Sequence, residues 1–163
     1  MTQFNRESQI FEVSYPDDMI ALKVDRCGYM LSSQNFNLPL VINMRAKSDG
    51  KALIELGCAQ ITIQLSTEPT WTKIHVVDDS NGEVIFHHKC HVYPIDTFAN
   101  IECLLSREGI AVRVNGEFWL YSTDYKYVRE FESNPDYGRT GSVFFGTSNG
   151  SMVTVESLRV TEL

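Results

Sequence analysis

The sequence predicts an all-β protein, an antiparallel sandwich of two sheets with roughly a dozen short strands and at most one short helix. Apolar and polar residues alternate in short runs, of which residues 40–46 are the clearest example. Turn residues separate these runs at spacings of about ten residues, which is typical of sandwiches. Asn115-Gly116 lies between two apolar runs, where it favours a type I′ hairpin turn. The length of 163 residues suits one domain that spans residues 1–163.

The predicted elements follow from this alternation in chain order. Pro16-Asp17-Asp18 turns the chain between the first two runs, because Pro presets φ and Asp bonds its own backbone. One helix of at most two turns is predicted over residues 125–132, since Asp124 can cap it and Pro135 stops it. Strands are expected at residues 10–15, 20–24, 40–46, 52–56, 60–65, 71–77, 84–93, 101–106, 110–114, 117–121, 143–147 and 153–163.

The hairpin over residues 110–121 has two faces, because side chains alternate along a strand. We expect Val112 and Val114 to face the core together with Phe118 and Leu120, which leaves Arg113, Trp119 and Tyr121 on the opposite face. The residues predicted to be buried are Ile42, Met44, Ile61, Ile63, Ile74, Val76, Cys103, Val112, Val114, Phe118 and Leu120.

The charge and the cysteines narrow the choice of partners and compartment. A formal net charge of -7 argues against nucleic acid, and no run of Lys or Arg indicates a membrane surface. The first residues lack the apolar segment of a secretory signal, so we expect a cytoplasmic protein, or a secreted one if a leader has been removed. Four widely spaced cysteines predict free thiols, with two disulfides as the alternative in a secreted chain.

No cofactor or metal is predicted from the motifs. In the run His87-His88-Lys89-Cys90-His91, only His88 and Cys90 share a strand face closely enough to hold one ion, and two ligands make a weak site. A semi-buried strand with outward histidines explains the run better. Paired catalytic carboxylates, a Ser or Cys triad signature and a phosphate loop are not recognised in the sequence, so we expect a protein that is not an enzyme.

The succession of runs, ending in the hairpin of residues 110–116, resembles the jelly roll of the concanavalin A-like lectin and glucanase superfamily. Within this superfamily the chain resembles the galectin-like and LamG-like domains, and galectins carry a similar Val-x-Val-Asn-Gly hairpin. The resemblance implies a jelly-roll sandwich and a lectin-like function. The chain lacks the His-x-Asn-x-Arg and Trp-Gly-x-Glu-x-Arg runs of galectins, and the Glu-x-Asp-x-Glu strand of the glucanases.

An aromatic and polar face is the candidate binding site. Sugar rings lie on aromatic side chains while polar side chains bind the hydroxyls. The predicted ligand-binding residues, on a concave sheet face, are Trp119, Tyr121, Arg113, Trp71, Lys73 and His75. Two alternatives stay open: these rings cover a second apolar layer or the short helix, or they form a contact in a protein-interaction module, including a homodimer through an edge strand or the aromatic face.

Overall fold

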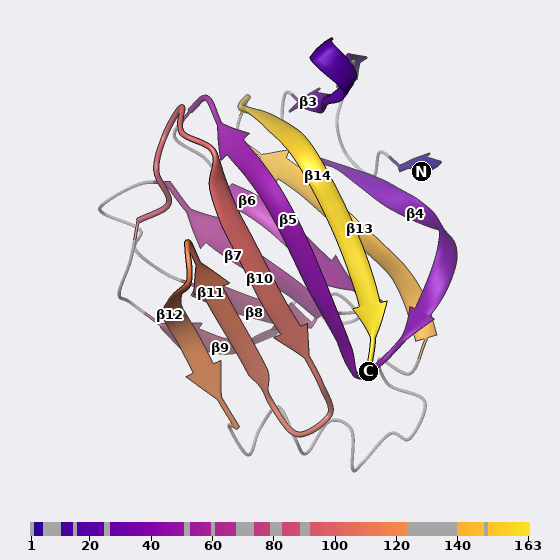
Figure 1. Cartoon of the computed structure of the whole chain (residues 1–163), viewed down its shortest axis with the longest axis vertical. Helices are drawn as coiled ribbons and strands as arrows, with labels where there is room; N and C mark the ends of the chain where they lie inside the picture. Colours follow the sequence, from indigo (N-terminus) through magenta and orange to yellow (C-terminus); the bar gives the residue numbers. More distant parts are fainter. Residues whose placement is uncertain are drawn as a thin grey trace.

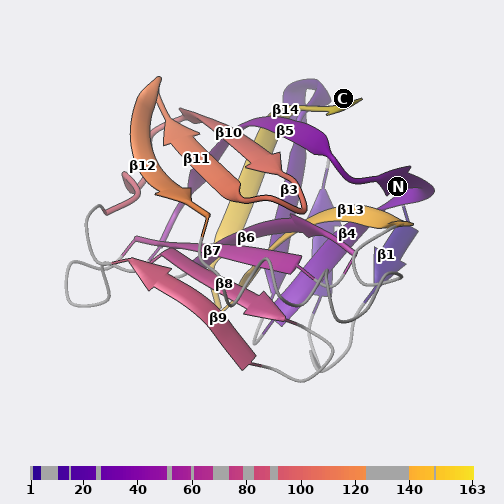
Figure 2. The same ribbon diagram turned by 90° about the horizontal axis from the view of Figure 1, so that it is seen from below.

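The structure is a computed structural model that describes residues 2–4, 11–14, 16–24, 27–50, 53–59, 61–67, 74–78, 83–88, 92–123, 140–148 and 150–163. These residues contain fourteen strands and one three-residue 3-10 turn, Pro16–Asp18. The strands form two antiparallel sheets of seven strands each, which we name sheet A and sheet B. Figure 2 shows them as two stacked layers. The predicted all-β sandwich is confirmed.

The strand order decides which residues become neighbours. Sheet A has the order β1 (Thr2–Phe4), β4 (Cys27–Asn37), β13 (Thr140–Ser148), β6 (Leu53–Cys58), β7 (Ile61–Ser66), β8 (Ile74–Asp78) and β9 (Glu83–His88). Sheet B has the order β12 (Glu117–Ser122), β11 (Ile110–Val114), β10 (Ala99–Leu105), β5 (Leu40–Ser48), β14 (Met152–Glu162), β3 (Ile20–Val24) and β2 (Phe11–Ser14). Figure 1 looks onto the outer face of sheet B, with β14, β5 and β10 in front.

The core lies between the sheets and follows the predicted alternation. In β5, Leu40, Ile42, Met44 and Ala46 are buried, and they belong to one hydrophobic cluster with side chains of both sheets. Burying such a side chain stabilises the fold by about 1.5–3 kcal/mol. The core prediction is confirmed for Ile42, Met44, Ile61, Ile63, Cys103, Val112, Val114 and Leu120. The side chains of Ile74 and Val76 lie outside the described part of the structure, although both residues are in β8.

The β11–β12 hairpin has the predicted two-residue turn. Asn115 and Gly116 both have positive φ, 51° and 82°, as a type I′ turn requires. The Asn115 side chain also accepts a 2.9 Å hydrogen bond from the Asn100 amide. Val114 pairs with Glu117 across the turn, which sets the register of the hairpin.

The predicted faces of Phe118 and Trp119 are wrong. Cross-strand partners point to the same side of a sheet, and Arg113 pairs with Phe118, so Phe118 lies on the outer face and is 54% exposed. The next pair is Val112 with Leu120, so the register shifts by one residue. This shift is a β-bulge, in which Trp119 is the extra residue of β12. Trp119 and Leu120 both turn inward, and Trp119 is only 8% exposed.

The buried Trp119 ring packs edge-on against Tyr93, with 6.3 Å between ring centroids and 76° between planes. Tyr93 is itself buried, and its hydroxyl donates a 2.7 Å hydrogen bond to the Ala46 carbonyl on β5. Burial raises the pKa of the Tyr93 hydroxyl. The pair links residues 92–98, β12 and β5, so Trp119 stabilises the fold and does not display a ring to solvent.

Two strands were not predicted, and one predicted element lies outside the described residues. β4 contains Ser32, Ser33, Gln34 and Asn35 in succession, which breaks the apolar alternation, yet β4 pairs with β13 along nearly its whole length. β1 pairs with β4 over three residues only. The helix predicted at residues 125–132 falls outside the described residues. No helix in the described ranges is long and apolar enough to span a membrane.

Two of the four cysteines can be placed with their side chains. Cys58 and Cys103 are free thiols, and both are buried. Burial raises the pKa of Cys58 to about 12 and also raises the pKa of Cys103. The prediction of free thiols is confirmed for this pair.

Candidate functional site

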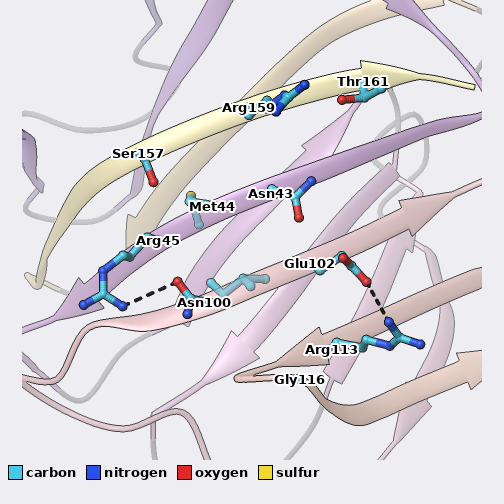
Figure 3. Close-up of a pocket in the computed structure, with 11 residues that line it drawn as sticks. Asn43, Met44, Arg45, Asn100, Glu102, Arg113, Gly116, Ser157, Arg159 and Thr161 are labelled. Carbon is cyan, nitrogen blue, oxygen red and sulfur yellow. Dashed lines mark hydrogen bonds and ion pairs between the residues drawn. The ribbon is translucent and has the colours of Figure 1, made fainter.

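A hollow of about 660 Å³, lined mainly by polar and charged residue types, lies on the outer face of sheet B. Four adjacent strands, β14, β5, β10 and β11, contribute its walls, together with the hairpin turn of β11 and β12 (Figure 3). The lining residues are Asn43, Met44, Arg45, Asn100, Ile101, Glu102, Arg113, Gly116, Ser157, Arg159 and Thr161.

Strand register explains why polar side chains converge here. The residues of β5 that alternate with the buried apolar ones face outward, and these include Asn43 and Arg45. Asn43 pairs with Glu102 on β10 and with Arg159 on β14, and Glu102 pairs in turn with Arg113 on β11. One row of side chains therefore crosses four strands.

A second row runs beside the first. Arg45 pairs with Asn100 on β10 and with Ser157 on β14. Thr161 lies two residues beyond Arg159 on the same face of β14. Together the two rows present amide, hydroxyl, guanidinium and carboxylate groups, that is, both donors and acceptors of hydrogen bonds.

Ion pairs hold two of the three arginines of the hollow. Arg113 Nη1 lies 3.3 Å from Glu102 Oε1, and Arg45 Nε lies 2.5 Å from Glu156 Oε2. Arg45 Nη1 also donates a 3.4 Å hydrogen bond to Asn100 Oδ1 (Figure 3). All four ion-paired side chains are about 40% exposed, so each pair contributes little to stability, about 0–1 kcal/mol. Their main effect is to orient the guanidinium groups.

Aromatic rings flank the polar rows. The Arg113 guanidinium lies over the Phe118 ring, 4.0 Å from its centroid. Tyr121, two places along β12 from Trp119, is 72% exposed. Phe98 lies under Arg45 and Lys47, with distances of 5.4 Å and 5.2 Å to its centroid. The hollow thus has exposed apolar surface beside hydrogen-bonding groups.

The six residues predicted to bind a ligand do not gather on one face. Arg113 lines the hollow, and Tyr121 is exposed on the same sheet. Trp119 is buried in the core and is removed from the set. His75 belongs to β8 of sheet A, where its backbone pairs with Gln64, and the remaining two predicted residues, Trp71 and Lys73, lie outside the described residues.

The outer face of sheet A differs from that of sheet B. Glu55 on β6 is 3% exposed and accepts a 2.8 Å hydrogen bond from the Gln64 amide on β7. Thr62 on β7 is also buried, as is Phe144 on β13, which meets Tyr29 edge-on. Where its side chains are described, much of this face is not accessible to a ligand.

The two residues considered as metal ligands, His88 and Cys90, belong to β9 and to the residues after it. His87 and His88 end β9, and their side chains lie outside the described part, as do Cys90 and His91 altogether. The described residues contain no group of three or more His, Cys, Asp or Glu side chains that could hold a metal ion. The prediction that no metal is bound therefore stays a prediction.

Comparison with known proteins identifies the fold. No family model and no curated protein sequence matches the chain. Among solved structures, the chain is similar to the carbohydrate binding module CBM66 from Bacillus subtilis, with a TM-score of 0.71 at 8% identity over 96% of this chain and 94% of that one. A Bacillus subtilis protein of unknown function with a galectin-like fold gives a TM-score of 0.74 at 10% identity, over 93% and 86% of the two chains.

Enzymes share the same architecture. A β-1,3-glucanase from Mycobacterium marinum has a TM-score of 0.64 at 14% identity, over 89% of this chain and 75% of that one. The fold is that of the concanavalin A-like lectins and glucanases, and the resemblance inferred from sequence is confirmed at this level. The structural similarity establishes the fold. Because the sequence identities are low, the function must be inferred from the site.

Proposed function

We propose that this protein is a non-catalytic carbohydrate-binding module that holds a glycan against the outer face of sheet B. The observation that carries the proposal is the hollow itself, where amide, hydroxyl, guanidinium and carboxylate groups from four strands converge beside exposed rings. Sugars present hydroxyls that both donate and accept, together with apolar C–H faces, so they suit such a surface. The likeness of the fold to CBM66 supports this choice of ligand.

The polar groups of the hollow differ in the hydrogen bonds that they can make with sugar hydroxyls. The amides of Asn43 and Asn100 each donate and accept, Arg113 only donates, and Glu102 only accepts while ionised. A sugar ring that packs on the exposed surface of Phe118 would bring its hydroxyls toward the Arg113 and Glu102 pair. Because the site is shallow and open, we expect Kd values of roughly micromolar to millimolar.

The hollow favours binding over hydrolysis. Glycoside hydrolysis generally requires two carboxylates that flank the scissile bond. Of the residues that line the hollow, Glu102 is the single carboxylate, and it is ion-paired with Arg113. The fold also occurs in a protein described as a pseudo β-1,3-glucanase from Mycobacterium tuberculosis, so it is compatible with either outcome. An assay for release of reducing ends from bound glycans tests this point, and turnover that a single substitution abolishes would contradict it.

A glycan array followed by calorimetric titration tests the binding proposal. Asn43→Ala and Arg113→Ala should each lower the affinity for a bound glycan about tenfold, since each removes hydrogen bonds worth about 1–1.5 kcal/mol. Gln34→Ala is the matched control, because Gln34 is an exposed amide on β4 of the other sheet. If Asn43→Ala and Arg113→Ala bind the glycan as tightly as the wild type and Gln34→Ala do, the glycan binds elsewhere and the proposal is overturned.

One observation favours a second function, that of a protein-interaction or oligomerisation module. Among the described strands, β12 lies at one edge of sheet B, and it exposes both Phe118 and Tyr121. Exposed edges can pair with a second chain. Sedimentation equilibrium discriminates the two functions: a stable dimer that Tyr121→Ala converts to a monomer, with no glycan bound by either form, would favour interaction.

A further inference from the structure

The hollow has a charge opposite to that of the protein. The whole chain carries 14 Lys and Arg against 21 Asp and Glu, a net charge of -7. The lining of the hollow nevertheless contains three arginines, Arg45, Arg113 and Arg159, and one carboxylate, Glu102. A cationic site on an anionic protein favours an anionic ligand.

The three arginines are not equivalent. Arg45 is paired with Glu156 and Arg113 is paired with Glu102, so a protein carboxylate already balances each of these charges. Arg159 makes no ion pair with any other described residue. It is exposed on β14, and Figure 3 shows it on the same strand as Thr161, with Asn43 on the neighbouring strand β5.

The surroundings of Arg159 can supply further donors. Asn43 lies opposite Arg159 on β5, and Ser157 and Thr161 lie two residues away on either side along β14. Neighbours two apart on one strand face are separated by about 7 Å, which is the width of a sugar ring with its substituents. An anionic group on Arg159 would therefore have an amide and two hydroxyls within reach.

We propose that the glycan is acidic and that the carboxylate of a sugar acid is seated on Arg159. This inference rests on the function proposed above, since it names the class of sugar for the same hollow. The planar guanidinium fork matches a carboxylate in a bidentate geometry, with two parallel hydrogen bonds. The rest of the sugar acid, or the next unit of the chain, extends toward Asn100 and Arg113, where the groups are arranged for hydroxyls.

Salt dependence follows from the exposure of Arg159. Its charge is screened by ions, with a Debye length of about 10 Å at 0.1 M salt and about 3 Å at 1 M. Affinity for an acidic glycan should fall as salt is raised, whereas affinity for a neutral glycan of the same ring should change little. A charge-assisted bidentate contact of this kind contributes about tenfold or more to affinity.

The experiment compares matched acidic and neutral glycans by calorimetric titration. The pairs are tri-galacturonic acid with its methyl ester, sialyllactose with lactose, and a glucuronic acid disaccharide with its glucose counterpart; sulfated lactose is added as an anion without a carboxylate. Wild type is compared with Arg159→Gln and with Lys23→Gln. Lys23→Gln is the control, because it also removes one exposed positive charge from sheet B. Lys23 lies on β3 and pairs with Met152, at the end of β14 far from Arg159.

We expect at least one acidic member to bind at least tenfold more tightly than its neutral partner, with the difference lost in Arg159→Gln and retained in Lys23→Gln. Equal binding of the acidic and the neutral member in every pair that binds, still weakened by Asn43→Ala, would overturn the acidic ligand and leave the proposed function standing. Sulfated lactose preferred over every carboxylate would overturn the carboxylate. A failure of every glycan to bind would overturn both proposals.

Discussion

Replacing Trp119 by alanine removes the largest side chain of the β11–β12 hairpin from the core. A tryptophan buries about 150–250 Å², and at about 25 cal/mol per Å² the loss amounts to about 4–6 kcal/mol. Large-to-small substitutions of aromatic core residues cost about 3–5 kcal/mol, which agrees. Its neighbour Phe118 has more than half of its surface exposed, so Phe118→Ala should cost less than about 1 kcal/mol.

Urea unfolding followed by circular dichroism measures both effects. With a slope of about 2 kcal/mol per M, Trp119→Ala should lower the midpoint by about 1.5–2.5 M, and Phe118→Ala by less than about 0.5 M. Trp119→Phe keeps a ring against Tyr93 and should fall between the two, which provides a measurable variant if Trp119→Ala does not fold. A larger loss from Phe118→Ala than from Trp119→Ala would show that the hairpin register described above is incorrect.

Three further outcomes are expected. Asn115→Ala should destabilise by about 1–2 kcal/mol in chemical denaturation, because alanine disfavours positive φ and leaves the Asn100 amide without its partner. Gly57→Ala should abolish soluble folded protein in expression trials, since its Cβ would overlap the Ile61 carbonyl oxygen across β6 and β7. The folded state keeps the Cys58 proton until its pKa of about 12, whereas the unfolded thiol titrates near 9.0, so Cys58 should make stability fall as pH rises from 9 toward 12; an unchanged slope in Cys58→Ala would contradict this.

The strands were largely predictable because their signals are local. Alternation in β5 depends on residues that follow one another, and the Asn115-Gly116 turn depends on two. β4 was missed because its buried residue Met30 is followed by a polar run, and its pairing with β13 joins segments more than 100 residues apart. Such pairing leaves no trace in the local pattern.

The site was less predictable, for two physical reasons. The face of Trp119 was misassigned because the two-residue turn pairs Arg113 with Phe118, which puts Trp119 on the opposite, inward face. The bulge that follows turns Leu120 inward as well, and no feature of the sequence predicts this bulge. The partners Asn43 and Arg159 were recognisable as outward positions of their strands. That they meet depends on the order of β5, β10 and β14 in sheet B, which alternation cannot provide.

The most direct test of the account is a map of the glycan on the protein by amide chemical shifts. A ¹⁵N-labelled sample titrated with a bound glycan should show perturbations that cluster on the rows of sheet B, at Asn43, Asn100, Glu102, Arg113 and Arg159. Amides of sheet A, such as those of Gln64 and Tyr29, should remain unchanged. Perturbations that cluster on Gln64 and His75, with none on β5 and β14, would contradict the assignment of the site to sheet B.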